Sequence, residues 1–444
     1  MITTELLIHG EWVIPVEPDD RVLEHHAIAI DHGKITAILP STEARERYQP
    51  QHEIHRPGHA LIPGLINSHT HAAMSLMRGL ADDLPLMSWL NDHIWPAEAE
   101  WVSPEFVRDG SDLAFAEMIR GGVTCFNDMY FFPMTVAEQA QKAGIRAVIG
   151  LIVIDFPTVW AKDSDEYLHK GLEVHDQLRH HPLITTAFAP HGPYTVSNPP
   201  LERIATLAEE LDTQIHIHIH ETAAEIAHGE KRYGNRPLAR LESLGLISPR
   251  TIAVHMTHLN PEEIARFAEL SGHVAHCPES NLKLASGFSP VVKLQAAGVN
   301  VALGSDGAAS NNDLNLFGEM RSAALLAKGV SSDASAVSAY TALQMATICG
   351  ARALAIEDQC GSLLPGKSAD IVAVNLDTIE TQPMYHPISQ LVYACDRHQV
   401  MDVWVAGEQL LKQRHLTRMD ESRILAQSRA WQQKLAANSY TQEP

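Results

Sequence analysis

Histidines make up 26 of the 444 residues, and one short run places two of them at a spacing that suits metal binding. The run Leu65 to His71 reads Leu-Ile-Asn-Ser-His-Thr-His, so His69 and His71 are two residues apart. In a β-strand such residues share a face, and two neutral imidazoles on one face can bind a divalent transition metal. A His-x-His pair is equally typical of a polar surface, so this run does not decide the matter alone.

A second run, Gln214 to Glu221, carries three histidines on one face and a carboxylate after them. His216, His218 and His220 alternate with isoleucines, and Glu221 follows. A hydrogen-bonded core histidine would account for one of the three, but hardly for all of them. The period of two leaves open which histidine is a metal ligand.

Two further apolar runs end in polar residues. His255 lies in Ala-Val-His-Met, and Asp306 lies in Leu-Gly-Ser-Asp-Gly. His255 could be a satisfied core histidine, and Asp306 could be the first residue of an ordinary Asp-Gly turn. If all these runs are strands of one parallel barrel, however, their ends meet on one face, where barrel enzymes place their active sites. The joint pattern therefore favours a functional site.

The elements that must position these residues are short apolar runs alternating with amphipathic stretches, a pattern typical of βα units. There are eight runs: Leu61 to His71, Val123 to Met129, Arg146 to Ile154, Leu183 to His191, Thr213 to Glu221, Thr251 to His258, Val274 to Asn281, and Val299 to Gly307. Eight units predict an α/β fold of the (β/α)8 TIM-barrel type. The gap of about fifty residues after the first run predicts extra helices over the barrel mouth.

Both ends of the chain have a different sequence pattern, which predicts short strands and frequent turns. Leu6 to Ile8, Ala27 to Ile30 and Ile35 to Ile38 lie at one end, and Ala369 to Val374 and Val403 to Ala406 at the other. Neither end has enough strands to bury a face alone. We therefore predict a small β-sandwich-like domain from residues 1–58 and 363–444, including a C-terminal helix over 421–437, beside a barrel formed by 59–362.

Composition excludes several classes of partner. The net charge is -21, and the basic residues are scattered, so the chain has no footprint for nucleic acid or an anionic membrane. The N-terminus lacks the order of a signal peptide, and no apolar run is long enough to span a bilayer. Five widely spaced cysteines indicate no disulfide framework. These features predict a soluble cytoplasmic protein.

With these residues in view, the sequence resembles the amidohydrolase superfamily of metal-dependent (β/α)8 hydrolases. The resemblance covers nearly the whole chain and rests on Pro63 to His71, His218 to Thr222, His255, Gly304 to Gly307, and the tail segment Gly361 to Ile371. It implies that His218 is the ligand of the second run and that Glu221, three residues later, is catalytic. His216 and His220 would then be neighbours of the ligand.

Within the superfamily the chain most resembles the aminohydrolases of 5'-methylthioadenosine and S-adenosylhomocysteine. The segments that carry this likeness are Trp89 to Glu98, Ala189 to Tyr194 and Gly307 to Asn312. The resemblance implies a purine nucleoside substrate, with Glu98 accepting hydrogen bonds from the ribose hydroxyls, Trp89 packing against the nucleoside, and His191 contacting it from the opposite side. Trp89 could also be an ordinary core residue.

One departure bears on the substrate. Members that accept S-adenosylhomocysteine place an arginine near the end of the third barrel strand, whereas this chain has Gly150 to Asp155 there, without arginine. We therefore expect deamination of 5'-methylthioadenosine, with its methylthio group in the apolar region of Leu151, Ile152 and Phe156. S-adenosylhomocysteine or adenosine could also be substrates. The alternatives are a guanine deaminase, an s-triazine-type amino- or chlorohydrolase, and a non-catalytic barrel that binds metal or purine.

The resemblance also implies a mechanism. His69, His71, His218 and Asp306 would hold one divalent metal ion per subunit, with zinc as the first choice and iron or manganese as alternatives. Asp306, with His255 beside it, would take a proton from the attacking water while Glu221 protonates N1 of the purine. No lysine ends the fourth strand, which argues against a bridged two-metal site. A homo-oligomer remains open.

Overall fold

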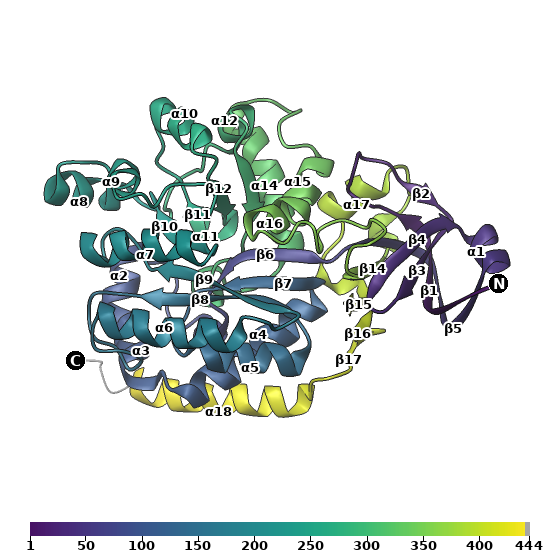
Figure 1. The fold of residues 1–444 in the computed structure, drawn as a ribbon, viewed down its shortest axis with the longest axis horizontal. Helices are drawn as coiled ribbons and strands as arrows, with labels where there is room; N and C mark the ends of the chain where they lie inside the picture. The colour runs from purple at the N-terminus through teal and green to yellow at the C-terminus, as the bar shows by residue number, and fades with distance from the viewer. Residues whose placement is uncertain (440–444) are drawn as a thin grey trace.

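The computed structural model describes residues 1–439 and contains two sheets (Figure 1). One is an eight-stranded parallel sheet surrounded by helices, and the other is a nine-stranded mixed sheet at one end of the molecule. Within the described residues no helix has both the length and the apolar character needed to cross a membrane. The predicted combination of a barrel and a small β domain is confirmed.

All eight predicted runs supply barrel strands, which pair in chain order. Their bounds are β6 (Leu65–Thr70), β7 (Val123–Asp128), β8 (Arg146–Val153), β9 (Ile184–Pro190), β10 (Gln214–Ile219), β11 (Thr251–His255), β12 (His273–His276) and β13 (Asn300–Leu303). The ends of the barrel meet where the Asp306 N–H donates to the carbonyl of His69 at 3.0 Å. Gly304 permits this approach, because a Cβ there would lie 2.9 Å from the His69 backbone nitrogen.

The first predicted run, Leu61 to His71, begins four residues before its barrel strand. Leu61 and Pro63 belong to β5 (Tyr48–Pro63) of the other sheet, and the barrel begins only after Gly64. A Cβ at Gly64 would lie 1.9 Å from the Thr124 hydroxyl oxygen, so the chain passes between the two sheets at a point where no side chain fits. When an apolar run passes from one buried sheet to another, its hydrophobic pattern does not show where the first strand ends and the second begins.

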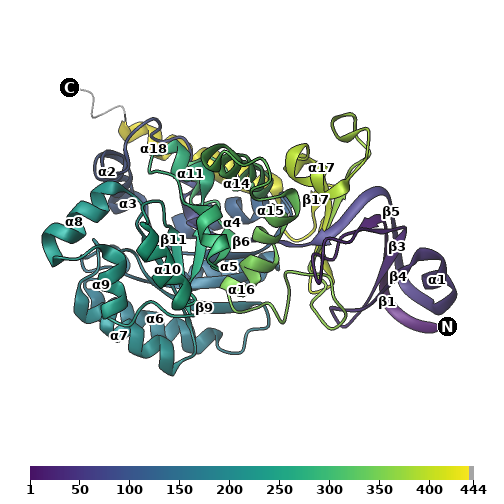
Figure 2. The ribbon, with the colours of Figure 1, turned by 90° about the horizontal axis from the view of Figure 1, so that it is seen from above.

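Helices surround the barrel and link its strands (Figures 1 and 2). Those between β6 and β7 are η1 (Ala72–Met77), α2 (Leu86–Ser88), the π-helix η2 (Trp89–Ile94), α3 (Trp95–Trp101) and α4 (Pro104–Arg120). The later ones are α5 (Pro133–Ala143), α6 (Ser164–Leu178), α7 (Asn198–Glu210), α8 (Ala223–Tyr233), α9 (Pro237–Ser243), α10 (Pro261–Glu269), α11 (Pro278–Lys283), α12 (Val291–Ala296), α13 (Ala308–Asn311), α14 (Leu316–Ser331), α15 (Ala339–Met345) and α16 (Ile348–Ala353). The long first loop is thus helical, as expected.

Strands from both chain ends build the second sheet, in the order β17-β16-β15-β14-β5-β1-β3-β4 with β2 beside β1. Their bounds are β1 (Ile2–Val13), β2 (Leu23–Glu24), β3 (His26–Asp31), β4 (Lys34–Pro40), β14 (Ile371–Asn375), β15 (Val400–Val405), β16 (Glu408–Lys412) and β17 (His415–Leu416). Ile30 of β3 and Trp404 of β15 share one apolar cluster, so the sheet curls on itself. Helix α1 (Ser41–Arg47) covers a second, smaller cluster.

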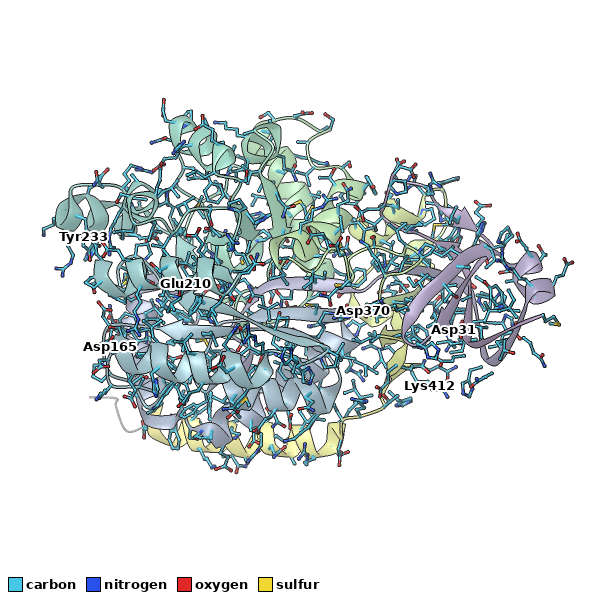
Figure 3. All side chains as sticks on the ribbon, viewed as in Figure 1. Asp31, Asp165, Glu210, Tyr233, Asp370 and Lys412 are labelled. Carbon is cyan, nitrogen blue, oxygen red and sulfur yellow. The ribbon has the colours of Figure 1, made fainter. Side chains whose placement is uncertain are left out.

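A buried ion pair joins the two parts of the molecule. Arg146, the first residue of β8, donates from Nε to Asp370 Oδ2 at 3.0 Å, just before β14. Figure 3 labels Asp370 where the barrel meets the small sheet. Arg146 is therefore held at the bottom of the barrel, away from its mouth.

The remaining helices follow the barrel in the chain. They are η3 (Ile379–Thr381), α17 (Pro387–Tyr393), η4 (Arg397–Gln399) and α18 (Glu421–Ser439). Although α18 follows the small sheet, it packs along α4, where Trp431 Nε1 donates to Asp109 Oδ2 at 2.9 Å. We propose that α18 belongs with the barrel rather than with the β domain of residues 1–58 and 363–444, of which 440–444 lie outside the described residues.

Candidate active site and metal centre

Four metal-ligand candidates converge at the carboxyl ends of the barrel strands. His69 lies in β6, His71 one residue after it, His218 in β10 and Asp306 after β13. Their facing atoms are close: His69 Nε2 is 3.3 Å from His218 Nε2 and 3.2 Å from Asp306 Oδ1, and His71 Nε2 is 3.3 Å from the same oxygen. Two ligands each bonded to a tetrahedral zinc ion lie roughly 3.4 Å apart, so this donor set fits such an ion.

The other ring nitrogen of each histidine is held by a partner, as is usual for metal ligands. The Nδ1–H of His71 donates to the carbonyl of Met129 at 2.6 Å, and that of His218 to the carbonyl of His191 at 2.5 Å. His69 Nδ1 contacts Nε2 of His216 at 2.8 Å. Burial lowers the pKa of His69 to about 4 and that of His218 well below its usual value, so both rings are neutral.

The three histidines in and directly after β10 thus have three different positions. His218 faces the candidate metal centre, and His216 lies one layer deeper and supports His69. His220 has a left-handed backbone, with φ 55°, and its Nε2 accepts from the N–H of Leu238 at 3.1 Å, outside the site. This is the arrangement that the family resemblance implied, with His216 and His220 as neighbours.

Three donors other than the histidines hold the carboxylate of Asp306. Its Oδ2 accepts from the hydroxyls of Ser280 at 2.6 Å and Ser310 at 2.9 Å, and its Oδ1 accepts from the N–H of Gly307 at 2.7 Å. Its positive φ of 59° turns the chain at the end of the barrel strand. Burial would raise the pKa of this carboxyl, but the hydrogen bond from His69 and the surrounding histidines hold it well below its usual value.

His255 and Glu221 complete the polar end of the site. His255 Nδ1 is 2.8 Å from Asn281 Oδ1, and its Nε2 lies 3.8 Å from Glu221 Oε1. Burial, and next the charge of Asp306, raises the pKa of Glu221 to about 8. A carboxyl that keeps its proton at neutral pH can act as a general acid, while the ionised Asp306 beside it can act as a base.

A clamp that sequence reasoning missed holds Glu221 in place. The carboxylate of Glu225 accepts from the N–H groups of His220 at 2.9 Å and Glu221 at 2.8 Å. The hydroxyl of Thr257 lies 2.9 Å and 2.8 Å from the carbonyl oxygens of the same two residues. Thr222-x-x-Glu225 has the form of a capping box, which signals a helix start, but the glutamate bonds the preceding turn.

Glu225→Gln should therefore lower turnover without removing the metal. The amide keeps one acceptor for two N–H groups, and leaving a buried donor unpaired costs about 1–3 kcal/mol, so we expect kcat to fall by about tenfold to 100-fold. Steady-state kinetics and metal analysis would test this. The exposed Glu230→Gln on the same helix is the control, and loss of metal from Glu225→Gln would show that the clamp acts on His218 instead.

A cavity of about 500 Å³ opens above these groups. The predicted site residues His71, His191, His218, Glu221, His255 and Asp306 line its polar end, and Trp89 and Glu98 line the side formed by the first loop. His69 lies buried beneath. The structure thus brings all nine predicted site residues to one place.

Glu98 and His191 face this cavity, and each has a hydrogen-bond partner and a shifted pKa. Glu98 accepts a hydrogen bond from the Tyr130 hydroxyl at 2.8 Å, and burial raises its pKa to about 7. His191 Nδ1 contacts Thr195 Oγ1 at 3.1 Å, and burial, with the charges of His71 and His69, lowers its pKa to about 3. Trp89, only 5% exposed, is held by the π-helix η2 and still borders the cavity.

The rest of the cavity wall is apolar. Ile152, Ile154, Phe156 and Val159 from the end of β8 and its loop face Leu90 and Trp95 of the first loop. Among the described residues that line this cavity there is no lysine or arginine. An adjoining cavity, which shares Phe156 and Glu221 with the first, is bordered by His228 and Arg232 of α8.

Comparisons with known proteins agree with this geometry. The model of the amidohydrolase family matches residues 60–410. The chain is 50% identical to a 5-methylthioadenosine/S-adenosylhomocysteine deaminase of Teredinibacter turnerae over 98% of both chains. An adenosine deaminase from Xanthomonas campestris, solved with bound zinc, is 53% identical with a TM-score of 0.97, and the match covers 98% of this chain and 99% of that one.

A more distant likeness is to an atrazine chlorohydrolase from Arthrobacter aurescens TC1 complexed with zinc, which is 27% identical with a TM-score of 0.89, covering 96% of this chain and 99% of that one. The family match spans far more than half of the chain, and the fold and the site's donor set accord with it. This chain belongs to the amidohydrolase family.

Proposed function

We propose that the protein hydrolytically deaminates 5'-methylthioadenosine to the 6-oxo nucleoside and ammonia. The observation that carries this proposal is the pairing of two carboxyls with opposite pKa shifts, Glu221 and Asp306, at the polar end of a cavity whose other side offers Glu98. Relatives named as deaminases of 5-methylthioadenosine, S-adenosylhomocysteine and adenosine support it.

His69, His71, His218 and Asp306 would hold one divalent ion, for which zinc is the first choice. When bound, such an ion lowers the pKa of water toward neutrality and so supplies a nucleophile. The bound zinc of the Xanthomonas structure supports this assignment. The remaining chemistry consists of proton transfers by residues of this chain.

Glu221 donates its proton to N1 of the adenine ring as water adds to C6, which relieves the negative charge that develops on the ring nitrogen. Asp306, beside His255, takes one proton from the water and returns it to the departing amine. Ammonia then leaves, the C6–O double bond forms, and the last hydroxyl proton restores the acid on Glu221. The product keeps the proton on N1, so the reaction balances as nucleoside plus water.

The nucleoside would lie along the cavity. Glu98 is suited to accept hydrogen bonds from the two ribose hydroxyls, because a carboxylate oxygen is an acceptor and Tyr130 occupies only one of its oxygens. Trp89 supplies a flat apolar wall, and the neutral ring of His191, directly after β9, faces the base. The 5'-methylthio group would then lie among Ile152, Ile154 and Phe156.

The apolar wall also predicts which nucleosides are used. S-adenosylhomocysteine would bring a carboxylate into a cavity lined by no lysine or arginine, and leaving it unpaired costs a few kcal/mol. We expect kcat/KM for S-adenosylhomocysteine to be at least about 100-fold below that for 5'-methylthioadenosine. Ammonia release from 5'-methylthioadenosine, S-adenosylhomocysteine, adenosine, guanine and an aminotriazine would measure this.

Each result of this panel has a definite meaning. Deamination of guanine alone would contradict the role of Glu98, since guanine has no ribose. Turnover of the triazine alone would assign the chain to heterocycle hydrolysis, and no ammonia from any compound would contradict the proposed function. Equal use of both thioether nucleosides would contradict the apolar 5' subsite and direct attention to Arg232 and His228 in the adjoining cavity.

A further inference from the structure

A second group of metal-ligand side chains lies on the small sheet. His9 of β1 pairs with His55 of β5 in parallel register, and Glu53, two residues before His55, points to the same face. One ligand atom from each of these three residues lies within 4.8 Å of the other two. Figure 1 shows β1 and β5 at the end of the molecule opposite α8 and α9, which flank the barrel mouth, so the group is separate from the catalytic centre.

The distances from the Glu53 carboxylate to the two imidazoles match those of a zinc site. Glu53 Oε1 is 3.0 Å from His9 Nε2 and 3.4 Å from His55 Nε2. Ligands of a tetrahedral zinc ion lie roughly 3.4 Å apart, and the candidate catalytic ligands show 3.2–3.3 Å by the same measure. The two imidazole rings stack, with centroids 4.5 Å apart and planes 20° from parallel, so both direct Nε2 toward the one carboxylate.

A partner orients the buried member of the group. His9 is 5% exposed, and its Nδ1 lies 2.9 Å from the hydroxyl oxygen of Ser41, the first residue of α1. With the proton on Nδ1 and donated to Ser41, Nε2 has a free lone pair directed at Glu53. This is how second partners fix the tautomer of metal-binding histidines.

Charge and exposure define what kind of site this is. Arg45 of α1 acts electrostatically on His9 and opposes a cation there, whereas Glu53 supplies an offsetting negative charge. The side chains of Glu53 and His55 are 37% and 48% exposed. A bound ion would thus have three protein ligands and an open, water-facing position, and it would exchange with the solution.

We infer that His9, Glu53 and His55 form a second divalent-metal site, of the zinc class, on the small sheet. Two imidazole nitrogens and one carboxylate oxygen favour zinc over magnesium or calcium, which prefer oxygen ligands alone. The site is distinct from the catalytic centre, so it does not depend on the proposed reaction.

Zinc stoichiometry tests the inference on the full chain. Metal-free protein would be dialysed against Zn²⁺ buffered at low micromolar free concentration, and zinc per chain would be counted by mass spectrometry. We expect two ions in the unsubstituted protein, one in His55→Ala with unchanged kcat/KM, and one in His218→Ala without activity. His52→Ala, an exposed histidine of the same strand whose side chain alternates to the other face, should keep two.

A second variant distinguishes the loss of a metal ligand from a folding defect. Glu53→Gln keeps the shape and one acceptor of the side chain but removes its charge, and we expect it to weaken the second zinc ion by at least tenfold while the thermal midpoint of the metal-free protein is unchanged. One ion in the unsubstituted chain would overturn the inference and leave Ser41, His9 and Glu53 as a hydrogen-bonded chain only. Two ions in His55→Ala would overturn it as well.

Discussion

Glu221→Gln is expected to lower kcat by about 10² to 10⁴-fold, the usual contribution of one proton-transfer residue, while metal content stays at the level of the unsubstituted protein. Glutamine has the size of glutamate but cannot donate an acidic proton to N1. Because Glu221 is not one of the four proposed metal donors, and its Oε1 lies 3.8 Å from Nε2 of His255, the exchange should leave the metal donors in place. Single-turnover kinetics with metal analysis on the same samples would measure both quantities.

The exposed Glu210→Gln at the end of α7 is the matched control for this exchange and should keep full activity. The KM for 5'-methylthioadenosine should change little, since the acid acts mainly in the transition state. Near-normal turnover in Glu221→Gln would contradict its role as the acid. Loss of metal together with activity would instead place Glu221 among the residues that build the metal centre.

His218→Ala is expected to lose the catalytic metal and, with it, essentially all turnover. His218 is one of four donors, and its Nε2 lies 3.3 Å from that of His69. Changes to residues behind a ligand already weaken metal binding by about 10- to 100-fold, so removal of a ligand should exceed 100-fold. Competition with a chromophoric chelator would measure the affinity, and kcat/KM would be recorded at saturating zinc.

His180→Ala, an exposed histidine after α6, is the control and should leave affinity and activity unchanged. The prediction fails if His218→Ala retains tight zinc binding and turnover. In that case His216, which lies one layer deeper on the same strand, would have to be reconsidered as a ligand.

Much of the fold could be predicted because the apolar runs in the sequence coincide with the buried strands of the structure. Each of the eight apolar runs supplies one barrel strand, and the strands from both chain ends pair through β5 and β14. The boundary at Gly64 was not predictable, because residues 61–66 are buried on both sides of it in two different sheets. Nor could the local pattern show that α18 lies along α4. Amphipathicity indicates that one face of a helix is buried, but not which element it packs against.

The candidate site, like the fold, could be predicted from the sequence only in part. The residue types at strand ends indicated a metal centre, but the period of two could not separate His216, His218 and His220. The structure separates them by depth and by the turn at His220: His216 lies beneath His69, His218 faces the site, and His220 turns away at a positive φ. The roles of Glu225 and Thr257 could not be predicted, because both side chains bond backbone groups of His220 and Glu221, and the sequence shows only a capping-box pattern there.

By itself, then, the sequence determined the class of fold, the strand ends that carry the chemistry and the family to which the chain belongs, because these depend on residue type and periodicity. Only the tertiary structure decided which ring nitrogens face one another, which carboxyl keeps its proton, and that His9, Glu53 and His55 from distant segments meet on one sheet face. Distances, burial and pKa values arise from groups far apart in the chain, and no local pattern contains them.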